Sequence, residues 1–298
     1  MPSAQNGRGK PRGFNDMRNI LHDYLTDLHD FQRIAIAIAK GGVAREAREI
    51  DLTQPSTWEF SGFSQNGEDG IIDILKSALR EPNRYFLEIG SADGVQNNTT
   101  WLLVSQQYHG VMVEGDPAKS AKARRLLAGC GIGVRFESRF VTRENAEELL
   151  QLCAHAQPDL FSLDIDGNDY YIAQALLNAR LRPKIVIVEY NSIFGPQRSV
   201  TIPYSPDFDY RKANPTRLYY GVSLGAWQKL FGAAGYRFVT VERNGVNAIF
   251  ADPAQFRSGF LDAVKALNYA ENTYQVSASG KRGEEQFALI RGLELVEV

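Results

Sequence analysis

The chain has 298 residues, 44% of them hydrophobic and 23% charged, and a formal net charge of −2. This length predicts one sizeable α/β core with appendages and speaks against two equal domains. Because binding to phosphate backbones depends on clustered Lys and Arg, the near-neutral charge speaks against a nucleic-acid partner and favours a small-molecule or protein-borne substrate.

Cysteines and terminal segments limit the compartment. Cys130 and Cys153 lack the spacing of a zinc site or a disulfide framework. Basic residues at 8, 10 and 12 are not followed by an apolar signal region, and no window approaches 18 uncharged apolar residues. We therefore expect a cytoplasmic protein without a membrane partner.

The first 63 residues precede the expected core. Residues 1–13 are rich in Gly, Pro and basic residues, which predicts a disordered arm. Residues 14–63 are expected to form a helical extension, with an amphipathic helix from Asn15 to about Lys40 and a second over Val43–Ile50 after the two glycines at 41 and 42. The extension would be either a lid over a pocket or a dimer face that forms a homo-oligomer.

A loop and a helix over 67–79 lead into the core. Glu68 and Asp69 fall in the first helical turn, where they would either complement the helix dipole or contact a ligand.

A buried strand at 85–89 ends in the loop Glu88-Ile-Gly90-Ser91-Ala-Asp93-Gly94, and Thr99 is expected to cap the following helix. Glycines after a first strand let backbone N–H groups approach a nucleotide closely. The spacing differs from G-x-G-x-x-G, and two acids at the loop would repel a pyrophosphate. They would suit a cation, and S-adenosylmethionine carries a sulfonium and an ammonium.

The second and third strands, at 110–113 and 134–137, add further candidates. Glu114, Gly115 and Asp116 end the second strand, where an acid can accept both ribose hydroxyls. In the alternative interpretation, Glu114 only caps a strand of a generic doubly wound domain. After a helix at 117–127 and the third strand, the segment Ser138-Arg139-Phe140 would reach the adenine ring.

Acidic residues follow the fourth and fifth strands, at 160–163 and 184–188, after a helix at 144–153. Asp164 and Asp166 follow the former, and Glu189 and Asn191 the latter. Side chains two apart share a face, so these four should converge as oxygen ligands for Mg²⁺. Alternatively, Asp164 holds the methionine ammonium and Glu189 orients substrate. Asp169 is expected to cap a helix at 170–179, and the spacing of Gly167 rejects an EF-hand.

The remaining chain supplies a loop and a sheet edge. Residues 192–221 are too long and aperiodic for a simple connection, so we interpret them as a substrate loop rather than a surface excursion. A helix at 223–234 precedes a hairpin, 236–242 with 247–251, closed by a primed turn at Asn244-Gly245. Residues 253–298 would form a helical tail, with one helix reaching about Leu267.

Three motifs carry a family resemblance. The glycine loop with Asn98-Thr99, the Val113-Glu114-Gly-Asp116-Pro sequence and Leu163-Asp164-Ile-Asp166-Gly resemble class I S-adenosylmethionine-dependent methyltransferases, most closely the FkbM-like O-methyltransferases. The segment Ser64–Asp69 is similar to one that precedes that family's core. The fourth-strand motif departs from the family's usual Asp-x-Glu-Gly.

The resemblance covers 64–252 and implies a Rossmann-like doubly wound seven-stranded sheet with a terminal antiparallel hairpin. It implies that S-adenosylmethionine is held by residues from the loops named above: Gln65, Glu88, Gly90, Ser91, Asp93, Gly94, Asn98, Thr99, Glu114, Gly115, Asp116, Ser138, Arg139 and Asp164.

The expected activity is O-methylation of a small-molecule hydroxyl, with Asp164, Asp166 and Glu189 as catalytic residues and Mg²⁺ held by them with Asn191. Alternatives are a non-catalytic S-adenosylmethionine-binding module, a methyltransferase for a protein or glycan acceptor, and a dinucleotide-dependent oxidoreductase.

Overall fold

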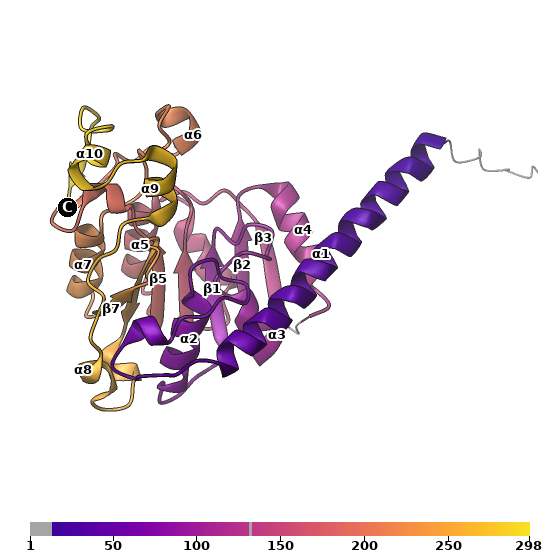
Figure 1. The fold of residues 1–298 in the computed structure, drawn as a ribbon, viewed down its shortest axis with the longest axis horizontal. Coiled ribbons are helices and arrows are strands. Elements are labelled where there is room, and N and C mark those ends of the chain that lie inside the picture. The colour runs from indigo at the N-terminus through magenta and orange to yellow at the C-terminus, as the bar shows by residue number, and fades with distance from the viewer. Residues whose placement is uncertain (1–13, 131–132) are drawn as a thin grey trace, which may run out of the picture.

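A seven-stranded sheet forms the centre of the computed structural model, which describes residues 14–130 and 133–298 (Figure 1). The strand order is β3-β2-β1-β4-β5-β8-β7, and β8 runs antiparallel to the other six strands. The strands are β1 Tyr85–Ile89, β2 His109–Glu114, β3 Val134–Ser138, β4 Leu160–Leu163, β5 Ile185–Glu189, β7 Arg237–Val241 and β8 Asn247–Ala251. This is the predicted doubly wound sheet with its terminal hairpin. The predicted arm at 1–13 lies outside the described residues.

Helices cover both faces of the sheet, because the central strands carry apolar side chains on both faces. In β1, Phe86 joins one apolar cluster while Leu87 and Ile89 join the other. The first face packs against α2 Glu68–Ser77, α3 Thr100–Gln106 and α4 Pro117–Leu127, and the second against α5 Asp169–Asn178 and α7 Leu224–Ala233. The segment predicted as a helix at 144–153 is a 3-10 helix, Ala146–Leu152.

Strand registers place the ends of four strands at one level. Ile89 of β1 is opposite both Val113 of β2 and Leu163 of β4, and Leu163 is opposite Val188 of β5. The chain proceeds from β1 outward to β3 and then returns to β4, so the strand order reverses between β1 and β4. In open α/β sheets ligands bind outside the carboxyl ends of the strands at this reversal.

The N-terminal extension holds one α-helix, α1 Phe14–Glu46, whose first part projects beyond the body (Figure 1), and then the 3-10 turn Pro55–Thr57. The predicted break at 41–42 and the second helix over 43–50 are therefore wrong. The Trp101 ring lies 2.7 Å from where a Cβ of Gly41 would be, and this packing outweighs the weak helix propensity of glycine.

An apolar stripe on α1 is exposed, with Leu21, Tyr24, Leu28 and Phe31 between 44% and 64% accessible. None of the described α1 residues lines the large cavity considered below. None of the helices described here is long and apolar enough to cross a membrane.

The C-terminal segment is not a single helical tail. Residues 253–267 contain a 3-10 turn, Pro253–Gln255, and the short α8 Phe260–Ala263, because Phe256 and Leu261 are drawn into the core. Further on come α9 Thr273–Ser279, α10 Gly283–Phe287 and β9 Val296–Glu297, which pairs with β6 Val200–Thr201.

The C-terminal elements pack against the 192–221 segment, which contains the 3-10 turn Ser192–Phe194 and α6 Tyr210–Ala213. Figure 1 shows α6, α9 and α10 together at one end of the sheet.

The hairpin has a longer loop than predicted. Instead of a two-residue primed turn, residues 242–246 separate β7 from β8. The buried carboxylate of Glu242 accepts hydrogen bonds from the backbone N–H groups of Asn244, Val246 and Asn247. These bonds hold the longer loop closed.

Candidate functional site

A cavity of about 800 Å³ lies at the carboxyl ends of β1, β2 and β4. Of the predicted cofactor-binding residues it is lined by Gln65, Gly90, Glu114, Gly115, Asp116, Arg139 and Asp164. Residues 207–212, at and before α6, form another part of its wall. The cavity therefore joins the glycine loop to part of the predicted substrate loop.

Gly90 lets two strand ends approach closely. Its φ is +88°, and a Cβ built there would lie 1.6 Å from the backbone oxygen of Asp164. Any larger residue would push the first-strand loop away from Asp164. Gly94, by contrast, does not line the cavity, and its Cβ would lie 2.6 Å from the Leu127 side chain, so it serves packing against α4.

The two loop acids do not face the cavity, contrary to the prediction that they surround a cation there. The carboxylate of Glu88 is buried and accepts hydrogen bonds from Asn97 Nδ2 (2.7 Å), Asn98 N (2.9 Å) and Thr99 Oγ1 (2.6 Å). Thr99 occupies the N-cap position of α3, but its side chain makes no capping bond.

Glu88, Asn98 and Thr99 thus form a buried network that holds the loop to β1 and α3. Burial raises the pKa of Glu88 to about 7.

Ser91 and Asp93 also lie off the main cavity. The Ser91 N–H donates to the Val113 carbonyl oxygen, and Ser91 is buried. Asp93 is paired with Lys122 at 3.0 Å and Arg33 at 3.8 Å. It lines an adjoining hollow of about 400 Å³ that shares Gln65 with the main cavity. Asp93 therefore joins α1 to α4 beside the loop.

The segment Ser64–Asp69 is fixed by its own acids. Asp69 Oδ2 accepts the N–H groups of Gly62, Phe63 and Ser64 at 2.8–2.9 Å. Glu68 accepts the N–H of Asn66 at 2.8 Å. Both acids are buried and neither lines the cavity. Their hydrogen bonds hold the loop in the conformation that places the exposed Gln65 at the cavity wall.

At the end of β2, the Glu114 carboxylate faces the cavity and ties two loops together. Its two oxygens accept the N–H of Ala92 at 2.7 Å and of Asp116 at 2.8 Å. Each carboxylate oxygen keeps a further lone pair for a ligand hydroxyl. The Asp116 carboxylate caps α4 by accepting from the N–H groups of Ala118 and Lys119.

The third strand offers an aromatic ring at the same cavity. Phe140 is 57% exposed, lines the cavity and lies 3.2 Å from where a Cβ of Gly115 would be. Arg139 lines the cavity too, with its guanidinium paired to Glu137 and Glu148. Ser138 is exposed and does not line it.

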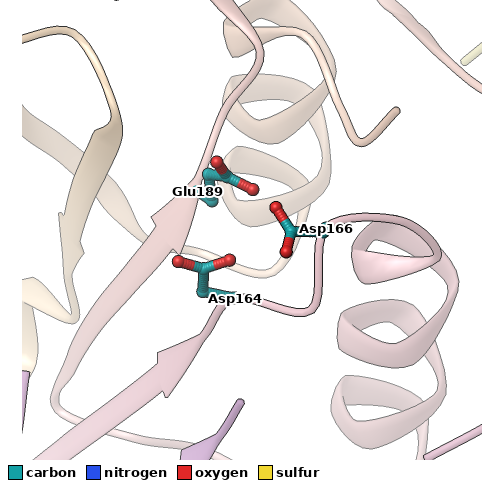
Figure 2. Close-up of side chains that lie close together, drawn as sticks. All are labelled: Asp164, Asp166 and Glu189. Carbon is teal, nitrogen blue, oxygen red and sulfur yellow. The ribbon is translucent and has the colours of Figure 1, made fainter. Parts of the chain in front are cut away.

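Three carboxylates converge beside this cavity. Asp164, Asp166 and Glu189 each place an oxygen within 4.8 Å of the others, and Figure 2 shows their side chains directed toward one another. Asp164 and Glu189 follow paired positions of β4 and β5. Asp166 has a φ of +55°, a conformation that an Asp adopts at some cost in energy and that favours a functional interpretation.

Mutual repulsion and burial determine the protonation of this acid triad. Burial raises the pKa of Asp164 and of Glu189 well above their usual ranges, and the neighbouring carboxyls raise both further. Burial also raises the pKa of Asp166, an effect that Arg211 and Lys119 partly offset. A hard divalent cation would relieve this repulsion, and carboxylate oxygens are the ligands it takes, so the donor set fits one.

Asn191 and Asp169 do not join the triad. The Asn191 amide nitrogen donates to the carbonyl oxygens of Leu218 (2.9 Å) and Tyr220 (3.0 Å), and its oxygen accepts from Ile193 N and Gln275 Nε2. The prediction of Asn191 as a metal ligand is therefore wrong, because its amide fastens loops behind β5.

Asp169 stands one residue inside α5, whose N-cap is Asn168, so the predicted cap is also wrong. It accepts from the N–H groups of Ile165 and Gly167 instead, which closes the loop that carries Asp166.

Several cavity or triad neighbours were missed by sequence reasoning. Gln96 and Lys119 line the cavity, and Tyr220 Oη donates to Glu189 Oε1 at 3.2 Å. The sequence signal for Tyr220 was the aromatic content of its long loop, while Gln96 and Lys119 carried none.

Comparisons with known proteins find likeness in structure only. No protein-family model matches the chain, and a search of curated proteins also finds no match.

Among similar solved structures, a possible exported protein from Bordetella parapertussis shares 16% identity over 61% of this chain and 65% of its own length, with a TM-score of 0.36. The CurJ carbon methyltransferase shares 12% over 79% and 69% of the respective chains, at a TM-score of 0.41. An O-methyltransferase from Bacillus cereus, in complex with SAH, shares 16% over 74% and 89%, at 0.41. Likeness this loose assigns no activity.

Proposed function

We propose that the chain is an S-adenosylmethionine-dependent O-methyltransferase of the FkbM-like type, acting on a small-molecule hydroxyl with the assistance of Mg²⁺. One observation carries the proposal: a single cavity brings together a closely approaching glycine loop, an acid at the end of the second strand and two members of the acid triad, Asp164 and Asp166, with a Glu189 oxygen within 4.8 Å of theirs. The first two features suit a nucleoside, and the third suits a hydroxyl that must lose a proton.

The donor half of the site uses the first three strand ends. Backbone groups around Gly90 approach the ligand, Glu114 accepts its ribose hydroxyls, and Phe140 stacks on its adenine ring. S-adenosylmethionine supplies a methyl group on a positively charged sulfur. The Glu114 carboxylate on the cavity wall suits that cation.

The acceptor half lies at the triad. Asp164, Asp166 and Glu189 would hold a divalent cation, which when bound polarises an acceptor oxygen as a Lewis acid. Without a cation at the triad, Asp166 or Glu189 would be the residue that accepts the hydroxyl proton, because burial raises the pKa of each toward that of a useful base. The new O–CH₃ bond forms as the C–S bond breaks, so the chain's main task is to keep acceptor and donor in line.

Residues 207–212 face the acceptor side and would choose the substrate. Phe208 and Tyr210 offer ring surface, and Arg211 places a positive charge whose field reaches Asp166. A large protein or glycan acceptor would have to enter past this same wall.

Two measurements test the proposal. Calorimetry with S-adenosylhomocysteine should show binding, whereas NAD⁺ should give none; the reverse result would indicate a dinucleotide enzyme. Transfer of a labelled methyl group to a panel of hydroxyl compounds, run with Mg²⁺ and after rigorous chelation, tests activity and metal use. Binding without turnover on any acceptor would favour a non-catalytic module. Full turnover after chelation would exclude the proposed role of Mg²⁺.

A further inference from the structure

The acid triad is supported from behind by a buried chain of amides and a phenol. Glu189 Oε1 accepts from the Tyr220 hydroxyl at 3.2 Å, and the Tyr220 oxygen accepts from Gln275 Nε2 at 2.9 Å. Gln275 Nε2 also donates to Asn191 Oδ1 at 3.2 Å. Glu189, Tyr220, Asn191 and Gln275 are 8%, 6%, 1% and 8% exposed, so water has little access to these bonds.

The directions of these hydrogen bonds are fixed by backbone groups that cannot reverse. Asn191 must point its NH₂ at the Leu218 and Tyr220 carbonyl oxygens, because carbonyls only accept. Its Oδ1 is then an acceptor, which obliges Gln275 to present its NH₂ rather than its oxygen. Since that NH₂ also donates to the Tyr220 oxygen, the Tyr220 proton is left to point at Glu189.

The residues of this hydrogen-bond chain come from three separate segments of the protein. Gln275 lies on α9, whose N-cap residue Asn272 accepts hydrogen bonds from the backbone N–H groups of Tyr274 and Gln275. These bonds fix the position of the Gln275 backbone. Tyr220 comes from the 192–221 segment and Glu189 from the end of β5. The Trp227 indole holds the Glu189 backbone oxygen at 2.7 Å, which fixes the main chain but not the carboxylate.

We propose that Gln275 and Tyr220 are positioning residues for Glu189: they keep a permanent hydrogen-bond donor on one carboxylate oxygen, so that the other is presented to Asp164 and Asp166. The C-terminal segment thereby completes the cation site. This inference rests on the proposed function, in which the triad binds a divalent cation. Neighbours that orient ligating carboxylates commonly affect metal affinity by 10- to 100-fold.

The test compares Gln275→Met and Tyr220→Phe, which remove the donors at nearly constant volume, with wild type. Gln286→Met is the matched control, because Gln286 is a buried glutamine in the same segment whose NH₂ donates to Ser279 Oγ instead. Calorimetry measures affinity for Mn²⁺ and, separately, for S-adenosylhomocysteine, and crystal structures report the Glu189 side-chain rotamer.

Both test variants should bind Mn²⁺ about 10- to 100-fold more weakly, with S-adenosylhomocysteine affinity unchanged within about twofold and Glu189 rotated, whereas Gln286→Met should match wild type. Unchanged Mn²⁺ affinity and an unmoved Glu189 in folded Tyr220→Phe would overturn the inference. If wild type binds no Mn²⁺, the metal part of the proposed function fails, and the Glu189 rotamer in the variants still decides whether these residues position it.

Discussion

Replacing Gly90 with Ala tests whether the first and fourth strand ends must touch. A methyl group at this position would lie 1.6 Å from the Asp164 backbone oxygen, far inside van der Waals contact. The Asp164 N–H donates to the Ile89 carbonyl oxygen at 3.0 Å, so the two strand ends cannot separate without breaking the sheet. The left-handed φ of +88° adds a second penalty for any L-residue.

The expected cost follows from these two effects. A left-handed alanine costs roughly 1–2 kcal/mol, and overpacking costs about 1–3 kcal/mol, so the free energy of unfolding should fall by roughly 2–5 kcal/mol. Because the clash displaces Asp164, affinity for both S-adenosylhomocysteine and Mn²⁺ should fall in the fraction that remains folded.

Urea unfolding followed by tryptophan fluorescence gives the free energy, since Trp58, Trp101 and Trp227 are all buried. Gly129→Ala is the control, because nothing lies within 4 Å of its Cβ position, and its stability should stay within about 0.5 kcal/mol of wild type. A Gly90→Ala protein with wild-type stability and wild-type binding would refute the close approach and its role in the site.

Three further predictions address other parts of the chain. Glu114→Ala should weaken S-adenosylhomocysteine binding roughly 10- to 100-fold in calorimetry, since a hydrogen bond to a charged group contributes about 1.5–3 kcal/mol. Ser138→Ala, at an exposed residue that does not line the cavity, should bind normally. Burial raises the pKa of Glu242 to about 8, whereas its ordinary pKa is near 4.5, so between these values the folded state holds a proton that the unfolded state has released. The free energy of unfolding, measured by urea titration, should therefore fall as the pH rises from 5 to 8, and Glu242→Gln should flatten this fall. We also propose that the exposed stripe of α1, whose apolar residues are spaced by three and four, pairs with the α1 stripe of a second copy of the chain. In sedimentation velocity, the double variant Leu28→Glu with Phe31→Glu should be a monomer, whereas the variant at the exposed Gln32, Gln32→Glu, should remain a dimer. A monomeric wild type would contradict this.

Regular elements were predictable because local signals decided them. The β1 and β4 strands and the α4 helix have the predicted boundaries, since buried apolar runs and the Asp116-Pro117 start are strong local patterns. The Gly41–Gly42 pair misled the prediction because a tertiary contact with Trp101, distant in sequence, keeps the helix intact.

The candidate site was predictable only in part. Convergence of Asp164, Asp166 and Glu189 followed from strand order, which the parallel topology determines. Period-two reasoning failed for Asn191 because β5 ends at Glu189 and the chain then turns into a 3-10 helix. The direction of Glu88 was misjudged because alternation along β1 does not reveal which hydrogen-bond donors await a buried carboxylate.

Gln275 had no signal in the sequence. It lies 86 residues beyond Glu189, in a segment expected to be an appendage, and its part in the site comes from two hydrogen bonds that only the folded arrangement defines. Side chains that act through a neighbour in this way leave no motif for a single sequence to show.

The central claim is that the cavity around Gly90, Glu114 and Asp164 binds the S-adenosyl group. Isothermal titration of the wild-type protein with S-adenosylhomocysteine tests it most directly. We expect saturable binding at one site per chain, weakened by Glu114→Ala but not by Ser138→Ala. Absence of heat with S-adenosylhomocysteine and with S-adenosylmethionine, on protein whose unfolding remains cooperative, would contradict it.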